Sequence, residues 1–481
     1  MATSSNLLNT DDTLSDILRF KTPTPDSRTP LLQNSGSQDA IATCSFKGDP
    51  FSRSLSIKRN LKTEKICCFE AFAHFLKGNV GSGFLSIPYA ISLAGLAVGP
   101  PLLAFVAGMS LYCMLLILKC ADRLCMKHGK EEMGYGDVVE LAFKDYFNGD
   151  GKVGRRAVDS FLILTQLGFC SIYFIFISQN IKTVVENYYP ETIINIKVYL
   201  VILLVFIMLT TFIWNMKALA IISVFGNICI FSGLGLVLVY ILLHADWKED
   251  TSQLIVGNVG SLPIFFGMAI YAFEGIGLVL PLRNEMMEPE KFPLVVASGM
   301  FVVLAGQIIF GILGFFCFQY HTAAIITFNL SKGWIGSLAQ ISVSLCVYLT
   351  YPLMFYVPVD ILLVHAKKKF INFHSFTVEF WLRVTLVMLT FLFAILIPHI
   401  DLFIALIGAL ASSSLALIFP PMVYVMVFRP TFGQRSICML IMLFGMFGTV
   451  VGTTYALKDI VCALSGLPIG GGWPCKPPPG H

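Results

Sequence analysis

The chain has 481 residues, of which 56% are hydrophobic and only 13% are charged, and its formal net charge is +4. An average soluble domain carries about 25% charged residues, so this chain has too few charged side chains to cover a soluble surface. The small positive charge is spread over loops and gives no reason to expect a nucleic-acid partner; the composition indicates an all-α, polytopic membrane protein.

Residues 1–60 are polar, rich in Ser, Thr, Asp and Pro, and lack the apolar stretch of a secretory signal peptide. They predict a disordered cytosolic tail over 1–65. Within this tail, Ser27-Arg-Thr-Pro-Leu-Leu32 resembles a dileucine sorting signal, so a cytosolic sorting or signalling partner is one interpretation. A transmembrane domain is expected over 66–460, followed by a short tail over 461–481.

Runs of about 20 apolar residues predict eleven transmembrane helices. They cover 70–95, 98–122, 158–186, 196–213, 217–243, 260–281, 294–319, 336–364, 379–398, 401–427 and 436–460. The shortest gaps, at 214–216 and 399–400, matter most, because fusion of two helices at either gap would invert the topology of everything that follows.

Lysine and arginine are concentrated in the loops on the same side as the N-terminal tail, with Lys367-Lys-Lys369 as one dense run. By the positive-inside rule, these loops and the N-terminus are cytosolic. An odd number of spans places the C-terminus on the extracellular or lumenal side. Asn329-Leu-Ser331 is a glycosylation sequon in a predicted outer loop, so Asn329 is predicted to carry a glycan, with chance occurrence as the alternative.

The first and sixth predicted helices are interrupted in a similar way. The first contains His74-Phe-Leu-Lys-Gly-Asn-Val-Gly-Ser-Gly-Phe-Leu-Ser-Ile-Pro88, and the sixth contains Phe273-Glu-Gly-Ile-Gly-Leu-Val-Leu-Pro281. Each glycine costs roughly 1 kcal/mol of helix propensity, and such segments persist in a membrane where unwound backbone lines a cavity. Because the two lie five helices apart, they predict a 5+5 inverted repeat with discontinuous helices 1 and 6. The general frequency of glycine in membrane helices is the alternative explanation.

An unwound segment exposes N–H groups on one half-helix and C=O groups on the other. This arrangement fits an α-amino acid zwitterion, with its carboxylate on the amides of Val80 to Gly83, and it would also suit another small zwitterion or a short organic anion. The predicted substrate-binding residues are Gly78, Asn79, Val80, Gly81, Ser82, Gly83, Phe273, Glu274, Gly275, Ile276 and Gly277. Candidate pocket walls are Tyr173, Thr350 and Tyr351, with ordinary core packing as the alternative for these and for Phe273 and Ile276.

These motifs carry a family resemblance. The stretch from His74 to Leu85 resembles the first span of the proton-coupled amino acid transporters, in the amino acid/auxin permease group of the APC superfamily. Arg155–Cys170 is similar to their third span and Phe265–Leu282 to their sixth, while Phe355-Tyr-Val-Pro358 and Ile397-Pro-His-Ile-Asp401 resemble later landmarks. The resemblance implies an APC/LeuT-type fold and proton-coupled transport of small neutral amino acids of the glycine, alanine and proline type.

The chain departs from this family in its cysteines. The resemblance implies a disulfide between outer loops, but the segments 187–195, 244–259 and 320–335 contain no cysteine. Cys462 and Cys475, near the C-terminus, are candidates for a different disulfide.

Two residues are candidates for proton coupling. Free histidine titrates near pH ~6.5, and the resemblance places the family's proton-linked histidine on His74. Helical spacing puts Glu70, His74 and Lys77 on one face. Glu274, beside the sixth-helix break, is predicted to bind a proton, counter the substrate ammonium or tie the break to a neighbouring helix. A structural, hydrogen-bonded role is the alternative for His74.

The sequence therefore predicts a proton-coupled symporter of small neutral amino acids in the plasma membrane or a lysosomal or endosomal membrane. We expect no enzymatic activity, no cofactor and no metal site. Two alternatives stay open: an amino acid sensor that signals through its N-terminal tail with little flux, and a sodium-driven or facilitative transporter.

Overall fold

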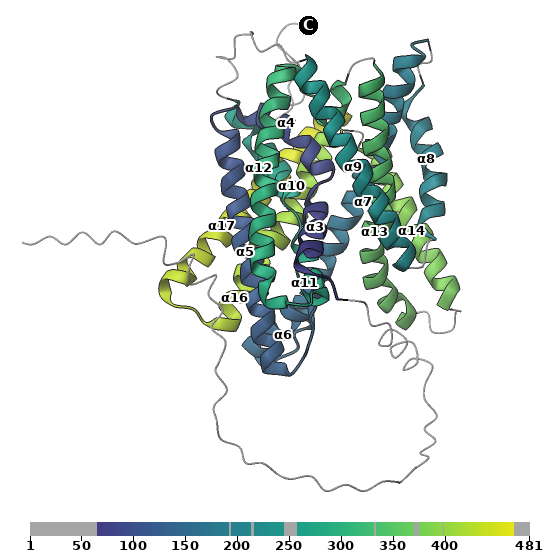
Figure 1. The fold of residues 1–481 in the computed structure, drawn as a ribbon. Coiled ribbons are helices and arrows are strands. Elements are labelled where there is room, and N and C mark those ends of the chain that lie inside the picture. The colour runs from purple at the N-terminus through teal and green to yellow at the C-terminus, as the bar shows by residue number, and fades with distance from the viewer. Residues whose placement is uncertain are drawn as a thin grey trace, which may run out of the picture.

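The computed structural model describes residues 65–191, 194–212, 216–244, 257–330, 333–369, 375–397 and 399–465. Helices make up nearly all of this part of the chain (Figure 1). In chain order they are α3 (Cys68–Asn79), α4 (Ser82–Ala94), α5 (Gly99–His128), α6 (Tyr135–Phe147), α7 (Lys152–Tyr188), α8 (Ile196–Thr211), α9 (Met216–His244), α10 (Leu262–Ala272), α11 (Ile276–Glu285), α12 (Phe292–Phe318), α13 (Trp334–Lys369), α14 (Ser375–Leu396), α15 (Ile400–Ile407), α16 (Phe419–Phe428) and α17 (Phe432–Leu464). Ile66 forms an isolated parallel bridge with Met286.

The expectation of an all-α, polytopic membrane protein is confirmed. By length and composition, nine stretches of the described chain are able to cross a membrane, and α4 and α8 are shorter apolar helices. The eleven predicted spans correspond to these nine, to the 16-residue α8 and to the divided pair α3 and α4. At the two critical gaps the helices are separate, because α8 ends at Thr211 before α9 begins, and α14 ends at Leu396 before α15 begins.

Both predicted interruptions are present. In the first span, α3 ends at Asn79 and α4 begins at Ser82; in the sixth, α10 ends at Ala272 and α11 begins at Ile276. Figure 1 shows α4 above α3 and α10 above α11 at the centre of the bundle, where α4 packs against α10 and α3 against α11. The two broken spans therefore lie side by side.

The sequence pattern predicts no membrane span between 122 and 158, whereas the structure contains α6 there. One face of this 13-residue helix is buried and includes Tyr135, Val138 and Ala142. The Tyr135 hydroxyl donates a hydrogen bond of 2.8 Å to the carbonyl of Leu415. The helix was missed because it is too short to span a bilayer and carries charged residues on its other face.

The segment between α15 and α16 continues as two π-helical stretches, Gly408–Ser412 and Ser414–Ile418. Gly408 faces Gly267 of α10, and a β-carbon on Gly408 would overlap the Gly267 carbonyl. A β-carbon on Gly267 would in turn overlap the backbone of Ala405. This backbone-to-backbone crossing fixes α10, and so the sixth-span break, against the last third of the bundle.

Candidate functional site

The two helix breaks are joined by a direct hydrogen bond. Ser82 opens α4, and its hydroxyl lies 2.8 Å from the Tyr271 hydroxyl near the end of α10, with both groups buried. Next to it, a β-carbon on Gly83 would lie 2.9 Å from the Cα of Ala272. Glycine at position 83 is therefore what allows α4 to approach the backbone of α10, as close helix packing in membranes requires.

The lower halves of the two broken spans also meet. The buried side chain of Asn79 closes α3 by donating from Nδ2 to the Phe75 carbonyl at 2.9 Å. A β-carbon on Gly275 would lie 3.1 Å from Asn79 Oδ1, and Gly78 lies against Leu278 of α11. Within the described chain, Asn79 Oδ1 is buried and accepts no hydrogen bond. The structure thus places Gly78, Asn79 and Gly275 together, with one acceptor open at the break.

Free amide groups point from the N-terminus of α4. The N–H of Val80 donates to the carbonyls of Leu76 and Lys77, so it caps α3, which corrects the expectation that this amide would serve the substrate. The described backbone provides no acceptor for the N–H groups of Gly81–Gly83. An N-terminal half-helix with free amides attracts an anion, so Gly81, Ser82 and Gly83 stay candidates for binding the substrate carboxylate.

The carbonyl end of α10 is closed by Gln307, a residue that the sequence patterns do not single out. Gln307 on α12 is fully buried, and its Nε2 donates to the Ala272 carbonyl at 3.2 Å. The Glu274 N–H donates to the Tyr271 carbonyl, and the Phe273 N–H donates to those of Ala269 and Ile270. The sequence feature that could have identified Gln307 is that it is a single polar side chain in an apolar span, because such residues face the interior of the helix bundle.

Glu274 is a buried carboxyl at the sixth-span break. It is 8% exposed, and its Oε1 finds no hydrogen-bond partner among the residues that the structure describes. Tyr135, Tyr173 and Tyr271 lie near it. Glu274 and the predicted pocket wall Tyr173 therefore lie in the same region, where a carboxyl in an apolar setting is suited to a proton or to a ligand cation.

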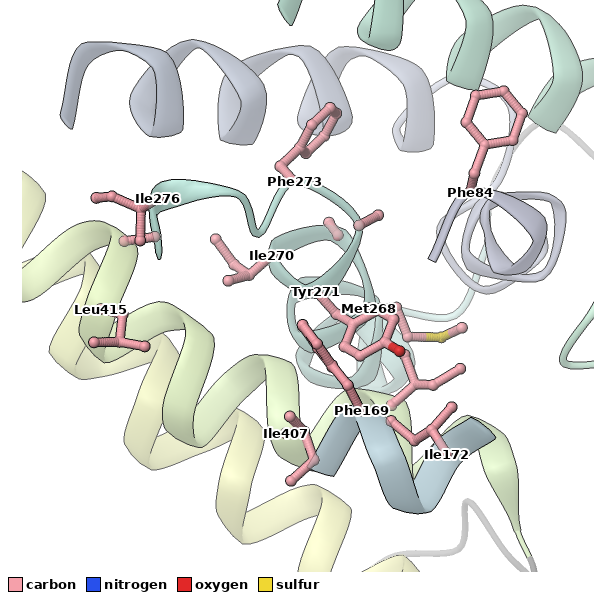
Figure 2. Close-up of a cluster of buried hydrophobic side chains, with 14 of the residues drawn as sticks. Phe84, Phe169, Ile172, Met268, Ile270, Tyr271, Phe273, Ile276, Ile407 and Leu415 are labelled. Atoms are coloured by element: carbon pink, nitrogen blue, oxygen red, sulfur yellow. The ribbon is translucent and has the colours of Figure 1, made fainter. Parts of the chain in front are cut away.

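Apolar side chains enclose this region (Figure 2). Phe273 and Ile276 lie on either side of the unwound segment and are 0% and 1% exposed. The rings of Phe169 and Tyr271 meet edge to face at 4.8 Å between centroids. Gly277 follows on α11, and a β-carbon there would make an ordinary van der Waals contact with Leu162 of α7. Buried apolar side chains therefore pack directly around the break.

The other two predicted pocket walls have different partners. The Tyr351 hydroxyl lies 3.0 Å from the Thr390 hydroxyl of α14, and its ring packs on Phe174 of α7. Thr350 donates to the Cys346 carbonyl within its own helix at 2.8 Å. These contacts are those of helix packing, and they give no support for Thr350 or Tyr351 as pocket walls.

His74 lies on the exposed face of α3, as does Glu70, whose carboxylate accepts from the Cys67 N–H at 2.9 Å. On another face of the helix, Phe75 packs against Gly299 of α12. Lys77 is half-buried and lies near Cys346 of α13. His74 therefore lies about one and a half turns before the break rather than in it, and its contact with substrate would be indirect.

A second connection joins the start of α3 to the end of α11, at the ends of these helices that lie away from the breaks. The Ile66 N–H donates to the Glu285 carbonyl at 2.9 Å, and the Met287 N–H donates to the Ile66 carbonyl at 3.0 Å. Arg283 of α11 also forms an ion pair with Asp122 of α5. The chain entering α3 and the chain leaving α11 are thus tied together, a link between distant segments for which no sequence pattern gives a signal.

Two predictions concern the opposite end of the molecule. The Asn329 side chain donates to the His321 carbonyl at 2.6 Å and accepts from the Ala323 N–H at 2.7 Å, so it braces its own loop. Ser331 of the sequon lies outside the described residues, and glycosylation of Asn329 stays a prediction. Cys462 is disulfide-bonded, and its predicted partner Cys475 lies outside the described residues.

Comparison with known proteins identifies similar chains and a similar fold. The family model described as transmembrane amino acid transporter protein matches residues 64–458. The proton-coupled amino acid transporter-like protein pathetic of Drosophila melanogaster is 30% identical over 408 residues, which cover 82% of this chain and 86% of the relative. Amino acid transporter AVT3B of Arabidopsis thaliana is 30% identical over 412 residues, covering 82% and 93%. An inward-facing structure of Mhp1, a LeuT-type inverted repeat, matches with a TM-score of 0.51 and 13% identity over 84% of this chain and 93% of that chain, which is a likeness of fold.

Proposed function

Because the chain belongs to the transmembrane amino acid transporter family, we propose that it is a symporter that couples the movement of small neutral amino acids to protons by alternating access. The junction of the two helix breaks, where Ser82 meets Tyr271 and Asn79 meets Gly275, is the observation that carries this proposal. In this fold, discontinuous helices at mid-membrane supply both the substrate site and the hinges.

The proposed topology has eleven spans in a 5+5 inverted repeat with one added helix. The pair α3 and α4 counts as a single broken span, α10 and α11 as a second, and α8 as a short span. The N-terminus is cytosolic, which agrees with the excess of lysine and arginine in the corresponding loops. We assign the protein to the plasma membrane or to a lysosomal or endosomal membrane.

In the proposed complex, the substrate carboxylate is held by the free amides of Gly81, Ser82 and Gly83. The ammonium group lies toward Glu274 and the unwound backbone of 273–275, where negative charge or carbonyl groups are present. Selection for small side chains follows from the buried rings of Phe273 and Tyr271 beside the break. A larger amino acid would have to displace these rings.

Proton coupling is proposed to use His74 and Glu274. His74 is accessible on α3, and histidine titrates in the range over which an acidic compartment differs from the cytosol. Glu274 is buried at the substrate site and has an oxygen without a hydrogen-bond partner in the described structure. Binding of a proton and of substrate to the outward-facing state shifts the conformational equilibrium only through their different affinities for the two states.

The test is radiolabelled uptake of glycine, alanine and proline by the full chain in proteoliposomes, at an external pH of about 5.5 and about 7.5. Each condition is measured with sodium and with choline in its place. We expect uptake that rises at the lower pH and is indifferent to sodium. Uptake that requires sodium, or that is unaffected by the pH gradient, overturns the proposed coupling; binding of amino acids without uptake favours the sensor.

A further inference from the structure

A basic pocket lies where α5, α6, α16 and α17 meet, at the end of the bundle seen at the lower left of Figure 1. Two adjoining cavities of about 450 Å³ and about 260 Å³ share Tyr146 and Arg429 as lining residues. The polar side chains that line them are Arg123, Lys127, Asp145, Tyr146, Arg429 and Arg435. We call this site the α5–α17 basic pocket; it is separate from the helix breaks and no part of the transport cycle above uses it.

The positive charge of the pocket is only partly neutralised. Its one acidic lining residue, Asp145, accepts from Lys127 Nζ at 2.8 Å and lies 2.9 Å from His128 Nε2. Burial raises the pKa of Asp145, but the hydrogen bonds from Lys127 and His128 lower it more, so the net shift is downward and the carboxylate is occupied by these two partners. Across the described part of the chain, no carboxylate lies within ion-pair distance of Arg123, Arg429 or Arg435.

The backbone at Arg429 is unusual for an arginine. This residue ends α16 in the left-handed conformation, with φ 46° and ψ 60°. Glycine is the usual residue at such a helix end because a β-carbon is disfavoured there. A charged side chain at a position that favours glycine points to a use for the guanidinium group, in keeping with the tendency of strained residues to mark functional sites.

Large apolar side chains surround the basic groups on the outer surface. Phe432 at the start of α17 is 88% exposed, and three further exposed side chains adjoin lining residues: Phe147 packs on Tyr146, Phe428 precedes Arg429 and Met126 precedes Lys127. Arginines next to exposed aromatic rings are typical of the membrane–water interface, where rings enter the lipid and cations face its headgroups. In the proposed orientation this end faces the cytosol, and the cytosolic leaflet carries the anionic lipids.

We propose that the α5–α17 basic pocket binds the phosphorylated headgroup of an anionic phospholipid from the cytosolic leaflet. The guanidinium groups of Arg429 and Arg435 contact the phosphate oxygens, for which their planar donor geometry is suited. Arg123 adds charge from α5, and Tyr146 and Phe432 lie on the side of the lipid glycerol and chains. The choice of a membrane lipid, rather than a soluble phosphate, rests on the exposed aromatic rim and on the proposed orientation.

The test uses the purified full chain and a fluorescence or thermophoresis measurement of binding to dioctanoyl phosphatidylinositol 4-phosphate, with dioctanoyl phosphatidylcholine as the uncharged comparison. We expect binding of the phosphoinositide that weakens by about 25-fold in the double variant Arg429→Gln/Arg435→Gln, from roughly fivefold for each arginine near a headgroup. Arg156→Gln is the matched control, because Arg156 is an exposed arginine at the start of α7 and does not line the pocket.

A second variant distinguishes loss of lipid binding from loss of folding. Arg429→Gly removes the cation but suits the left-handed backbone, so it should keep or raise the melting temperature while weakening lipid binding. Affinity for the phosphoinositide that is unchanged in both variants, or that falls equally in Arg156→Gln, overturns the proposal. Inositol phosphate or inorganic phosphate that binds as tightly as the lipid overturns the assignment to a membrane lipid and identifies a soluble anion instead.

Discussion

Alanine at Gly83 tests whether α4 and α10 meet as the structure has them. The new β-carbon would lie 2.9 Å from the Ala272 Cα and 3.1 Å from Cδ1 of the Tyr271 ring. Ordinary carbon contacts lie at roughly 3.5–4.0 Å, and the Ala272 atom belongs to the backbone, so it cannot turn away. The two helices must separate by about 0.6–1 Å, which also stretches the hydrogen bond between Ser82 and Tyr271.

The expected loss of stability follows from these two effects. Overpacking of a buried site costs about 1–3 kcal/mol, and a strained hydrogen bond forfeits about 0.5–1.5 kcal/mol, which together predict a destabilisation of about 1.5–4.5 kcal/mol. Gly81→Ala is the matched control, because no heavy atom lies within 4 Å of a β-carbon at position 81. That variant should keep the wild-type stability, while its methyl group stands beside the free amides and raises KM.

The assay pairs thermal unfolding of each purified variant in detergent with glycine uptake into proteoliposomes. Gly83→Ala should lose melting temperature and transport together, whereas Gly81→Ala should melt like the wild type and show a higher KM at an unchanged melting temperature. A Gly83→Ala protein with the melting temperature of the wild type would refute the close approach of α4 to α10. A Gly81→Ala protein with wild-type KM would refute the placement of the substrate carboxylate.

The site and its surroundings support four further predictions. His74→Ala should abolish pH-driven accumulation but retain amino acid exchange, and unchanged accumulation in a pH gradient would reject the coupling role. Gln307→Leu should lower stability by about 1–3 kcal/mol, because it leaves the Ala272 carbonyl buried without a donor; thermal melting measures this, and an unchanged melting temperature would contradict it. The pKa of Asp145 is lowered in the folded chain, so its carboxylate stabilises the fold above the unfolded pKa, and this contribution is lost as the pH falls through the folded pKa. Asp145→Asn should therefore slightly flatten the acid side of a profile of melting temperature against pH. A profile parallel to that of the wild type would disprove this. Spin labels at Phe69 and Met287, both exposed beside the Ile66–Met286 bridge, should keep one separation with and without substrate, and a substrate-dependent change in their distance distribution would show that α3 and α11 move apart.

The interruptions were predictable from sequence because they break local rules. Glycine and charged side chains are unfavourable in a lipid-facing helix in any surroundings. The segments Gly78–Gly83 and Glu274–Gly277 can therefore be recognised as interruptions without knowing which residues they contact. The pairing of the two breaks followed from their spacing of five helices. Both steps need only the chain and the properties of a bilayer.

Other parts of the site depend on contacts between distant segments, and the sequence does not encode them in a local pattern. Gln307 is a single polar residue whose partner, the Ala272 carbonyl, is known only once α12 lies beside α10. Tyr351 looks like a pocket residue by type, but its hydroxyl is directed to Thr390 of α14. Val80 lies within the glycine-rich segment, yet its N–H closes α3. In each case the tertiary arrangement decides which helix face a side chain occupies.

The connections around the breaks also indicate how alternating access would be divided among the four half-helices. On one side of the breaks, α4 is held to α10 by the Ser82–Tyr271 hydrogen bond and by Gly83, and α10 is held in turn by its backbone crossing at Gly267. On the other side, α3 and α11 are tied through Ile66. The short segments at 80–81 and 273–275 join these two pairs along the chain. Helical hydrogen bonding is interrupted there, so a rotation at these segments costs less than separation of either pair. A constant Phe69–Met287 distance during transport would therefore mean that α3 and α11 stay together as one unit, as this division into two pairs requires.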